Sequence, residues 1–257
     1  QKINLNRLNH TGPSGQAAMR QALLLFGDPR FEFIFEKPDA NGVKMNAQDT
    51  LIALHDWIDE RDTSATLNLQ GAGDPFPDGF GDENRNYVNY PHRYRAKNAN
   101  FDSLDELYQV DGVSDLFMAA FRDRVTVYPD KNRVLNINSN DPITQYVAIA
   151  SIAANEYDPK LQNPMIIESI LKEIAWFKMF SFTGMNAMTF INIVERNGIM
   201  IKADIKASGA QGNRWVSDKS ETFTITANGS AGKVNKTITA VVRYNEGLGK
   251  LLYYREE

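Results

Sequence analysis

Residues 91–139 hold an ordered series of segments that decides the fold. The series begins with PHRYRAKN at 91–98, continues with SLDEL at 103–107 and VDGV at 110–113, and ends with LNINS at 135–139. Each segment is weak alone. In this order they indicate a short helix, a hairpin centred on Gly112, a second helix, and a strand entering an Asn-rich turn. This layout is that of a helix-hairpin-helix motif.

The composition is that of an ordinary globular protein without thiol chemistry. The chain has 257 residues, of which 42% are hydrophobic and 23% charged, and its formal net charge is −4. A nucleic-acid binder normally carries a basic face, so this charge argues against one. The chain contains no cysteine, which excludes disulfides, thiolate zinc sites and thiol catalysis.

The sequence contains neither a membrane span nor a signal peptide. No apolar run approaches the roughly 20 residues that cross a bilayer. The chain opens at Gln1 and leads directly into INLN at residues 3–6, which has the pattern of a strand. We therefore expect that a leading segment has been removed from this sequence.

Strand periodicity is confined almost entirely to the two ends of the chain. Residues 3–8 alternate apolar and polar side chains, as a half-buried strand does. Near the other end, strands are predicted over 199–205, 221–227, 236–244 and 251–254, with 228–232 as a hairpin turn. We therefore predict an α+β fold. Residues 1–10 and 195–257 would form one antiparallel sheet, and residues 11–194 would form an inserted helical domain.

The middle of the chain has the features of helices. Ser14 or Gly15 is a suitable cap for a first helix, which ends at GDP, residues 27–29, and Asn46 is suitable for a second. Ser103 begins a helix whose first turn is acidic, which suits the helix dipole. Further helices are predicted over 113–127, 143–154, 165–180 and 187–195, and a short strand over 134–138.

Acidic residues gather at the end of the second helix and in the loop after it. The segment DWID at 56–59 closes that helix, and residues 62–90 lack regular periodicity. A loop of this length is uncommon in a compact domain unless it has a function. Calcium takes about six to eight oxygen ligands, which a flexible loop can gather. The candidate ligands are Asp59, Asp62, Asp74, Asp78, Asp82 and Glu83. The other interpretation is a helix end followed by a solvated acidic loop.

The hairpin at residues 103–123 has a second interpretation, as the DNA grip of a helix-hairpin-helix protein. Such a grip uses glycine-rich hairpin amides that face a phosphate. Here only Gly112 is present, and Asp111 and Asp115 lie beside it, where they would repel a phosphate. A packing role for the hairpin is therefore favoured.

An acidic-site hydrolase is the third possibility. Asp56 and Asp59 could form a carboxylate pair, but spacing along the chain says little about their separation in space. The histidines, His10, His55 and His92, form no pair at helical spacing, which argues against zinc. His55 lies on an apolar helix face and is interpreted as a core residue. Because the nucleophile-elbow and glycine-rich phosphate motifs are also absent from the sequence, we expect no enzyme.

The ordered series resembles the minor pseudopilin K (GspK) family of bacterial type II secretion systems. The resemblance rests on INLN at 3–6, DWID at 56–59, GA at 71–72, YRAKN at 94–98, LDEL at 104–107, Gly112 and LNIN at 135–138. Near the end of the chain, FTITANG at 223–229 and LYYRE at 252–256 look like the closing strands of that family.

The resemblance implies a pilin-like antiparallel sheet with a large inserted helical domain of the SAM-like or helix-hairpin-helix-like type. It implies a periplasmic protein, anchored in the inner membrane by a helix that precedes this sequence. Its role would be at the tip of the pseudopilus, bound to two other minor pseudopilins and supporting pseudopilus assembly and protein export. It also implies calcium in the inserted domain, and no nucleic-acid partner.

Overall fold

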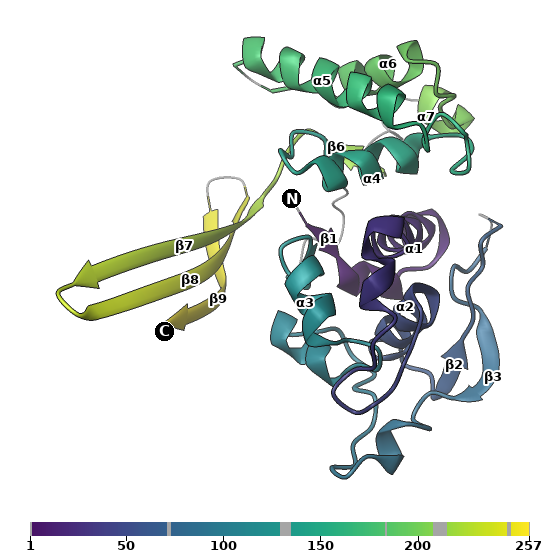
Figure 1. The fold of residues 1–257 in the computed structure, drawn as a ribbon, viewed down its shortest axis with the longest axis vertical. Helices are drawn as coiled ribbons and strands as arrows, with labels where there is room; N and C mark the ends of the chain where they lie inside the picture. Colours follow the sequence, from purple (N-terminus) through teal and green to yellow (C-terminus); the bar gives the residue numbers. More distant parts are fainter. Residues whose placement is uncertain are drawn as a thin grey trace.

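The structure is a computed structural model that describes residues 2–70, 73–128, 135–182, 184–207, 215–245 and 248–256. A helical body carries a three-stranded sheet that projects from it (Figure 1). The helices are α1 (Gly12–Phe26), α2 (Ala47–Asp56), α3 (Asp115–Phe121), α4 (Pro142–Ile152), α5 (Pro164–Phe180), α6 (Ala187–Arg196) and α7 (Ala203–Ala207). Short 3-10 helices are η1 (Leu5–Asn9), η2 (Pro29–Ile34), η3 (Tyr87–Asn89) and η4 (Leu104–Gln109). The strands are β1 (Ile3–Asn4), β2 (Thr63–Ala65), β3 (Asp78–Asp82), β4 (Val125–Thr126), β5 (Leu135–Asn136), β6 (Val216–Ser217), β7 (Thr222–Ala231), β8 (Val234–Asn245) and β9 (Leu248–Glu256).

Side-chain caps start most of the predicted helices. Asn46, Asp141 and Asn186 each accept a hydrogen bond from the backbone N–H three residues later, at 2.8–2.9 Å. Such a cap satisfies one of the unpaired N–H groups of the first helical turn. The helices predicted after Asn46 and over 143–154, 165–180 and 187–195 are thereby confirmed as α2, α4, α5 and α6.

A cluster of phenylalanines joins the first helix to the hairpin region. The rings of Phe26, Phe117 and Phe121 lie with centroids 4.8–5.1 Å apart, and all three side chains are fully buried. Aromatic contacts of this kind add to the free energy gained by burying the rings. The contact fixes α3 against α1, so the buried face of α3 belongs to the core of the body.

The predicted pairing of residues 3–8 with the C-terminal strands is wrong. Only Ile3 and Asn4 are strand, they pair in parallel with Val125 and Thr126, and η1 follows. Asparagine side chains explain the difference: that of Asn4 accepts a hydrogen bond from the N–H of Asn6, which turns the chain. The amide of Asn6 then donates to the carbonyl of Val127 at 2.6 Å. The N-terminal segment therefore lies in the helical body, and the division of the chain into two domains stays a prediction.

The strand predicted over 199–205 is also wrong. Ile201 makes a single antiparallel bridge with Ala153, and α7 begins two residues later. Ile201 and Ile205 are both buried and lie four residues apart, a spacing that fits a helix as well as a strand. The sequence pattern of this short apolar run therefore fits both a helix and a strand, and in the structure the run packs at the end of α4 and continues as α7.

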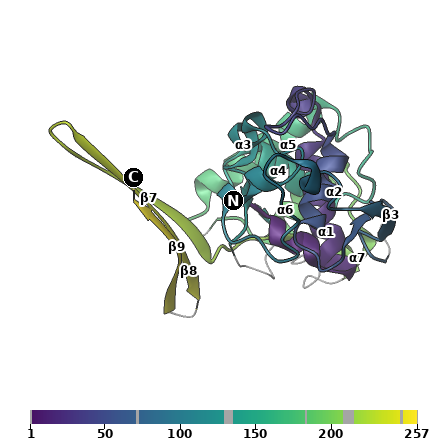
Figure 2. The same ribbon diagram turned by 90° about the horizontal axis from the view of Figure 1, so that it is seen from below.

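The C-terminal strands form an antiparallel sheet in the order β7-β8-β9. This confirms the three predicted strands. The predicted turn at 228–232 lies further on, because β7 continues to Ala231 and pairs there with Val234. Gly232 has φ +62°, the conformation that the first position of a two-residue II′ hairpin turn requires. Figure 2 shows the hairpin of β7 and β8 extending away from the body.

The two faces of this sheet differ in what covers them. Tyr253 packs on Tyr128 of the body with ring centroids 5.6 Å apart, and Arg255 pairs with Asp105 at 3.1 Å. Cross-strand pairing places another set of apolar side chains on the opposite face, where they are exposed: Phe223, Ile225, Leu251 and Tyr254. The sheet thus presents an apolar outer face.

The end of α5 also exposes large apolar side chains. Trp176 and Phe180 contact one another with ring centroids 4.9 Å apart, and both are exposed. Along the part of the chain that the structure describes, no helix is both long enough and apolar enough to cross a membrane.

Candidate metal site

The candidate site lies where α2 ends and the chain enters the predicted acidic loop. This loop is not structureless, because β2 and β3 pair as an antiparallel hairpin with an irregular register. Gly79 lies close to the neighbouring strand, and a side chain there would meet the carbonyl oxygen of Ser64 at 2.5 Å. The short, glycine-containing strands show no alternation of apolar and polar residues, so the sequence pattern did not reveal them.

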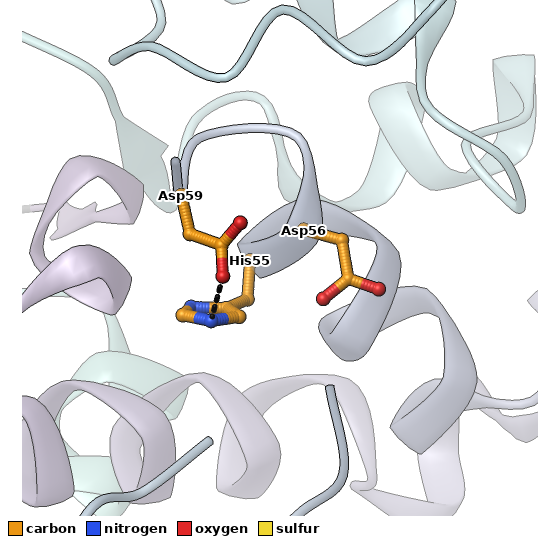
Figure 3. Close-up of side chains that lie close together, drawn as sticks. All are labelled: His55, Asp56 and Asp59. Carbon is orange, nitrogen blue, oxygen red and sulfur yellow. Dashed lines mark ion pairs between the residues drawn. The ribbon is translucent and has the colours of Figure 1, made fainter. Parts of the chain in front are cut away.

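His55, Asp56 and Asp59 come together at the end of α2 (Figure 3). Among the described residues, this is a group of three whose ligand atoms lie within 4.8 Å of one another. Asp59 and His55 face each other, with Nε2 3.2 Å from Oδ2, whereas Asp56 points to the other side. All three side chains are buried.

Asp56 holds the start of the hairpin. Its two carboxylate oxygens accept hydrogen bonds from the N–H of Ala65 at 3.0 Å and the hydroxyl of Ser64 at 2.9 Å. Burial raises the pKa of Asp56, and these two hydrogen bonds partly oppose the rise. The role of this carboxylate in the structure is to pair with the backbone of β2.

His55 is a core residue, as the sequence predicted. Its ring stacks on Phe76 with centroids 4.0 Å apart, and its Nδ1 lies 3.1 Å from the carbonyl oxygen of Leu8. That carbonyl can only accept a hydrogen bond, so Nδ1 donates to it. Nε2 faces Asp59 and the guanidinium of Arg61, at 2.8 Å from Nη2. Both ring nitrogens are therefore engaged, and His55 offers none to a metal.

Arg61 spans the acidic loop with a single guanidinium. Its Nε donates to Asp59 Oδ2 at 2.6 Å, and its Nη1 pairs with Asp78 at 2.5 Å. Its Nη2 donates to the carbonyl of Phe76 at 3.0 Å. Burial would raise the pKa of Asp59, but the hydrogen bonds from His55 and Arg61 outweigh it, and the pKa is lowered.

Glu83 is a buried carboxyl whose negative charge has no counter-cation in the structure. The residue is 9% exposed, and its Oε2 has no hydrogen-bond partner among the residues that the structure describes. Burial and the charges of Asp56, Asp59 and Asp62 together raise its pKa to about 8, and a hydrogen bond with Asn98 opposes the rise. A carboxylate placed in this way is unfavourable unless a proton or a cation neutralises it.

Asn98 lies beside Glu83 with an equally unpartnered oxygen. Its Nδ2 donates to the carboxylate of Asp62 and the carbonyl of Arg61, both at 3.4 Å, while its buried Oδ1 has no partner. Its φ of +51° is rare for a residue other than glycine. Strain of this kind persists where surrounding contacts fix the backbone. Here a hydrogen bond from the N–H of Ala96 to Asn84 anchors the segment next to Glu83.

The charges of two predicted ligands, Asp59 and Asp62, act on a third, Glu83, but among the described residues these three do not gather as closely as His55, Asp56 and Asp59 do. The other three carboxylates are held elsewhere. Asp74 and Asp82 accept hydrogen bonds from the N–H two residues later in their own turns, and Asp78 pairs with Arg61. Asn98 was not predicted, because an amide is not acidic. Its place in YRAKN, shortly before the next helix, was the available signal.

The donor set suits a hard cation. Calcium prefers carboxylate and amide oxygens, and Asp62, Glu83 and Asn98 supply both kinds from three separate segments. Two buried oxygens without partners are the feature of this structure that a bound cation would explain. The negative charge that raises the pKa of Glu83 would also be offset by such an ion.

The backbone N–H group of Gly112, at the centre of the hairpin, is already hydrogen-bonded to another part of the protein. The N–H of Gly112 donates to Asp39 Oδ2 at 3.0 Å, and the buried Asp111 accepts a hydrogen bond from Asn86 at 2.7 Å. A side chain at position 112 would meet Thr50 Oγ1 at 2.5 Å. The amide that a phosphate would need is therefore bonded to a carboxylate, which agrees with a packing role.

Comparisons with known proteins bear on the family and the fold of the chain. The family model for Type II secretion system (T2SS), protein K, matches residues 1–130. The fold is similar to that in the crystal structure of the GspK-GspI-GspJ complex from the enterotoxigenic Escherichia coli Type 2 Secretion System, with a TM-score of 0.62. That match has 16% sequence identity and covers 100% of this chain and 76% of the other. A search of curated proteins found no match.

Proposed function

Because the chain belongs to the family of type II secretion system protein K, a structural component of the secretion system, we propose that it is a minor pseudopilin at the tip of the pseudopilus. In that position it supports pseudopilus assembly and protein export. The observation that carries the proposal is the family match over residues 1–130 together with a fold shared along the whole chain. The described part would lie in the periplasm, with a preceding segment as its inner-membrane anchor.

The proposed partners are other minor pseudopilins of the same secretion system. The similar protein of known structure was crystallised as a GspK-GspI-GspJ complex. This chain offers an exposed apolar sheet face, formed by Phe223, Ile225, Leu251 and Tyr254. Contiguous apolar surface of this kind is typical of a protein–protein contact. We propose that a partner pseudopilin covers this face.

Mixing the chain with those pseudopilins tests the proposal. We expect a complex in size-exclusion chromatography with light scattering, and we expect Ile225→Ser to weaken it. Val234→Ser is the matched control, since Val234 is equally exposed but lies at the tip of the β7–β8 hairpin. Failure to form a complex with any partner, together with tight and salt-sensitive binding to duplex DNA, would contradict the proposal and favour a nucleic-acid binder.

Within this role we propose a structural calcium ion in the helical body. Glu83, Asp62 and Asn98 would hold it, with the charge of Asp59 nearby. When bound, the cation would neutralise the buried carboxylate and tie the segments around residues 62, 83 and 98 together. Because it would bind only the folded form, it would stabilise that form by mass action. Outside the cytosol, an affinity of about 10⁻⁴–10⁻³ M is enough to keep such a site occupied.

A further inference from the structure

The guanidinium of Arg61 lies between the end of α2 and strand β3, where it contacts acidic residues from both. It contacts a carboxylate from the end of α2, a carboxylate from β3 and a backbone carbonyl, those of Asp59, Asp78 and Phe76. A planar guanidinium is always charged and presents its donors in a fixed fork. One side chain therefore joins segments that are 17 residues apart along the chain.

The ligands of Arg61 are of the kinds that a divalent cation collects. Carboxylate and carbonyl oxygens are the usual partners of calcium. Asp59 and Asp78 would repel one another if they were brought together without a positive charge. In this chain Arg61 supplies that charge and contacts both carboxylates directly.

The part of the loop around Glu83 lacks such a cation. Glu83 Oε2 and Asn98 Oδ1 are buried and have no partner, and the hydrogen bonds of the Arg61 guanidinium go to other residues. The acidic residues thus fall into two groups. One group is neutralised by the protein itself, and the other is left for an ion.

We propose that Arg61 acts as a fixed internal cation that closes the β2–β3 loop onto α2 in the place of a metal ion, so that Asp59 and Asp78 take no calcium and the body binds only the one exchangeable ion proposed at Glu83. Arg61 is a positioning residue in this scheme. The count of one ion rests on the calcium site proposed above, whereas the closure of the loop by Arg61 does not.

Melting in chelator tests the closure without any ion. In EDTA, Arg61→Met should lower the melting temperature by about 5 °C, because it leaves the buried Asp59 without its charged donor. Arg61→Lys keeps the charge but not the forked arrangement of donors, so its melting temperature should lie between those of Arg61→Met and the wild type. Arg85→Met is the matched control, since Arg85 is exposed and makes no ion pair among the described residues. Equal melting of Arg61→Met and Arg85→Met in EDTA would overturn the proposal.

Isothermal titration calorimetry with calcium tests the number of ions that the chain binds. We expect one ion for the wild-type chain and for Arg85→Met, and two for Arg61→Met, in which Asp59 and Asp78 become free to take a cation. Two ions in the wild type, or an unchanged count in Arg61→Met, would overturn the replacement of a metal by Arg61. No ion in the wild type, with the loss of melting temperature in EDTA intact, would refute the calcium site and the count while supporting closure by Arg61.

Discussion

Replacing Glu83 by glutamine is expected to stabilise the calcium-free protein and to remove its response to calcium. The ordinary pKa of a glutamate is 4.5, and that of Glu83 is raised to about 8 in the fold, chiefly by burial. Below pH 4.5 the carboxyl is protonated in both the folded and unfolded states, so it costs nothing. Between pH 4.5 and 8 the unfolded state loses its proton while the folded state keeps it, so stability falls as the pH rises.

The size of this effect follows from the same pKa. At pH 7 the loss is about 3 kcal/mol, since each pH unit above 4.5 contributes about 1.4 kcal/mol. A glutamine cannot ionise and avoids the loss. In EDTA at pH 7, Glu83→Gln should therefore melt about 6–12 °C above the wild type, and the difference should vanish near pH 4.

Calcium should remove most of this difference. With a dissociation constant of about 10⁻⁴ M, 10 mM calcium stabilises the wild type by about 2.7 kcal/mol and leaves Glu83→Gln unchanged. Glu60→Gln is the control, because Glu60 is exposed and makes no ion pair among the described residues. The measurement is scanning calorimetry from pH 4 to 8, with and without EDTA. If Glu83→Gln melts below the wild type in EDTA at pH 7, or responds to calcium as the wild type does, this reasoning is refuted.

Three further substitutions test other contacts. Asp56→Ala should destabilise the protein by about 2 kcal/mol in urea unfolding, because it leaves the buried N–H of Ala65 unpaired, and an effect below 0.5 kcal/mol would contradict this. Phe117→Ala should destabilise it by about 4 kcal/mol by opening a cavity in the ring cluster, and binding of a small apolar ligand would reveal that cavity. Asp105→Asn should destabilise it by less than about 1 kcal/mol, since its arginine partners are surface residues, and a loss that persists in 1 M salt would disagree.

The helices and the C-terminal strands could be predicted from the sequence because their signals are local. Asn46 caps a helix wherever an amphipathic run follows, and residues 221–227 alternate over enough positions to be read as a strand. The position of residues 3–8, in contrast, depends on contacts with residues far away along the chain. Two asparagine side chains, Asn4 and Asn6, bond to backbone more than 90 residues away, and no periodicity records such contacts.

The acidic character of the site was visible in the sequence, but the sequence did not show which carboxylates pair with a guanidinium and which remain unpaired. Asp59 and Glu83 were both predicted as ligands, yet Asp59 pairs with Arg61 while Glu83 Oε2 has no partner among the described residues. Asp78 looked equivalent to them until the structure showed it paired with Arg61. Which carboxylate meets a guanidinium depends on the pairing of β2 with β3, in which the absence of a side chain at Gly79 allows the two strands to approach closely.

The parallel pairing of β1 with β4 constrains the order in which the body can form. Asn6 reaches Val127 across 121 residues, so β1 has no strand partner until about half of this sequence has emerged. At a synthesis rate of about 5–20 residues per second, that wait lasts about 6–25 s. Contacts this distant in sequence also slow folding. During that interval Ile3, which is buried in the finished fold, lacks its strand partner and is open to chaperones and proteases.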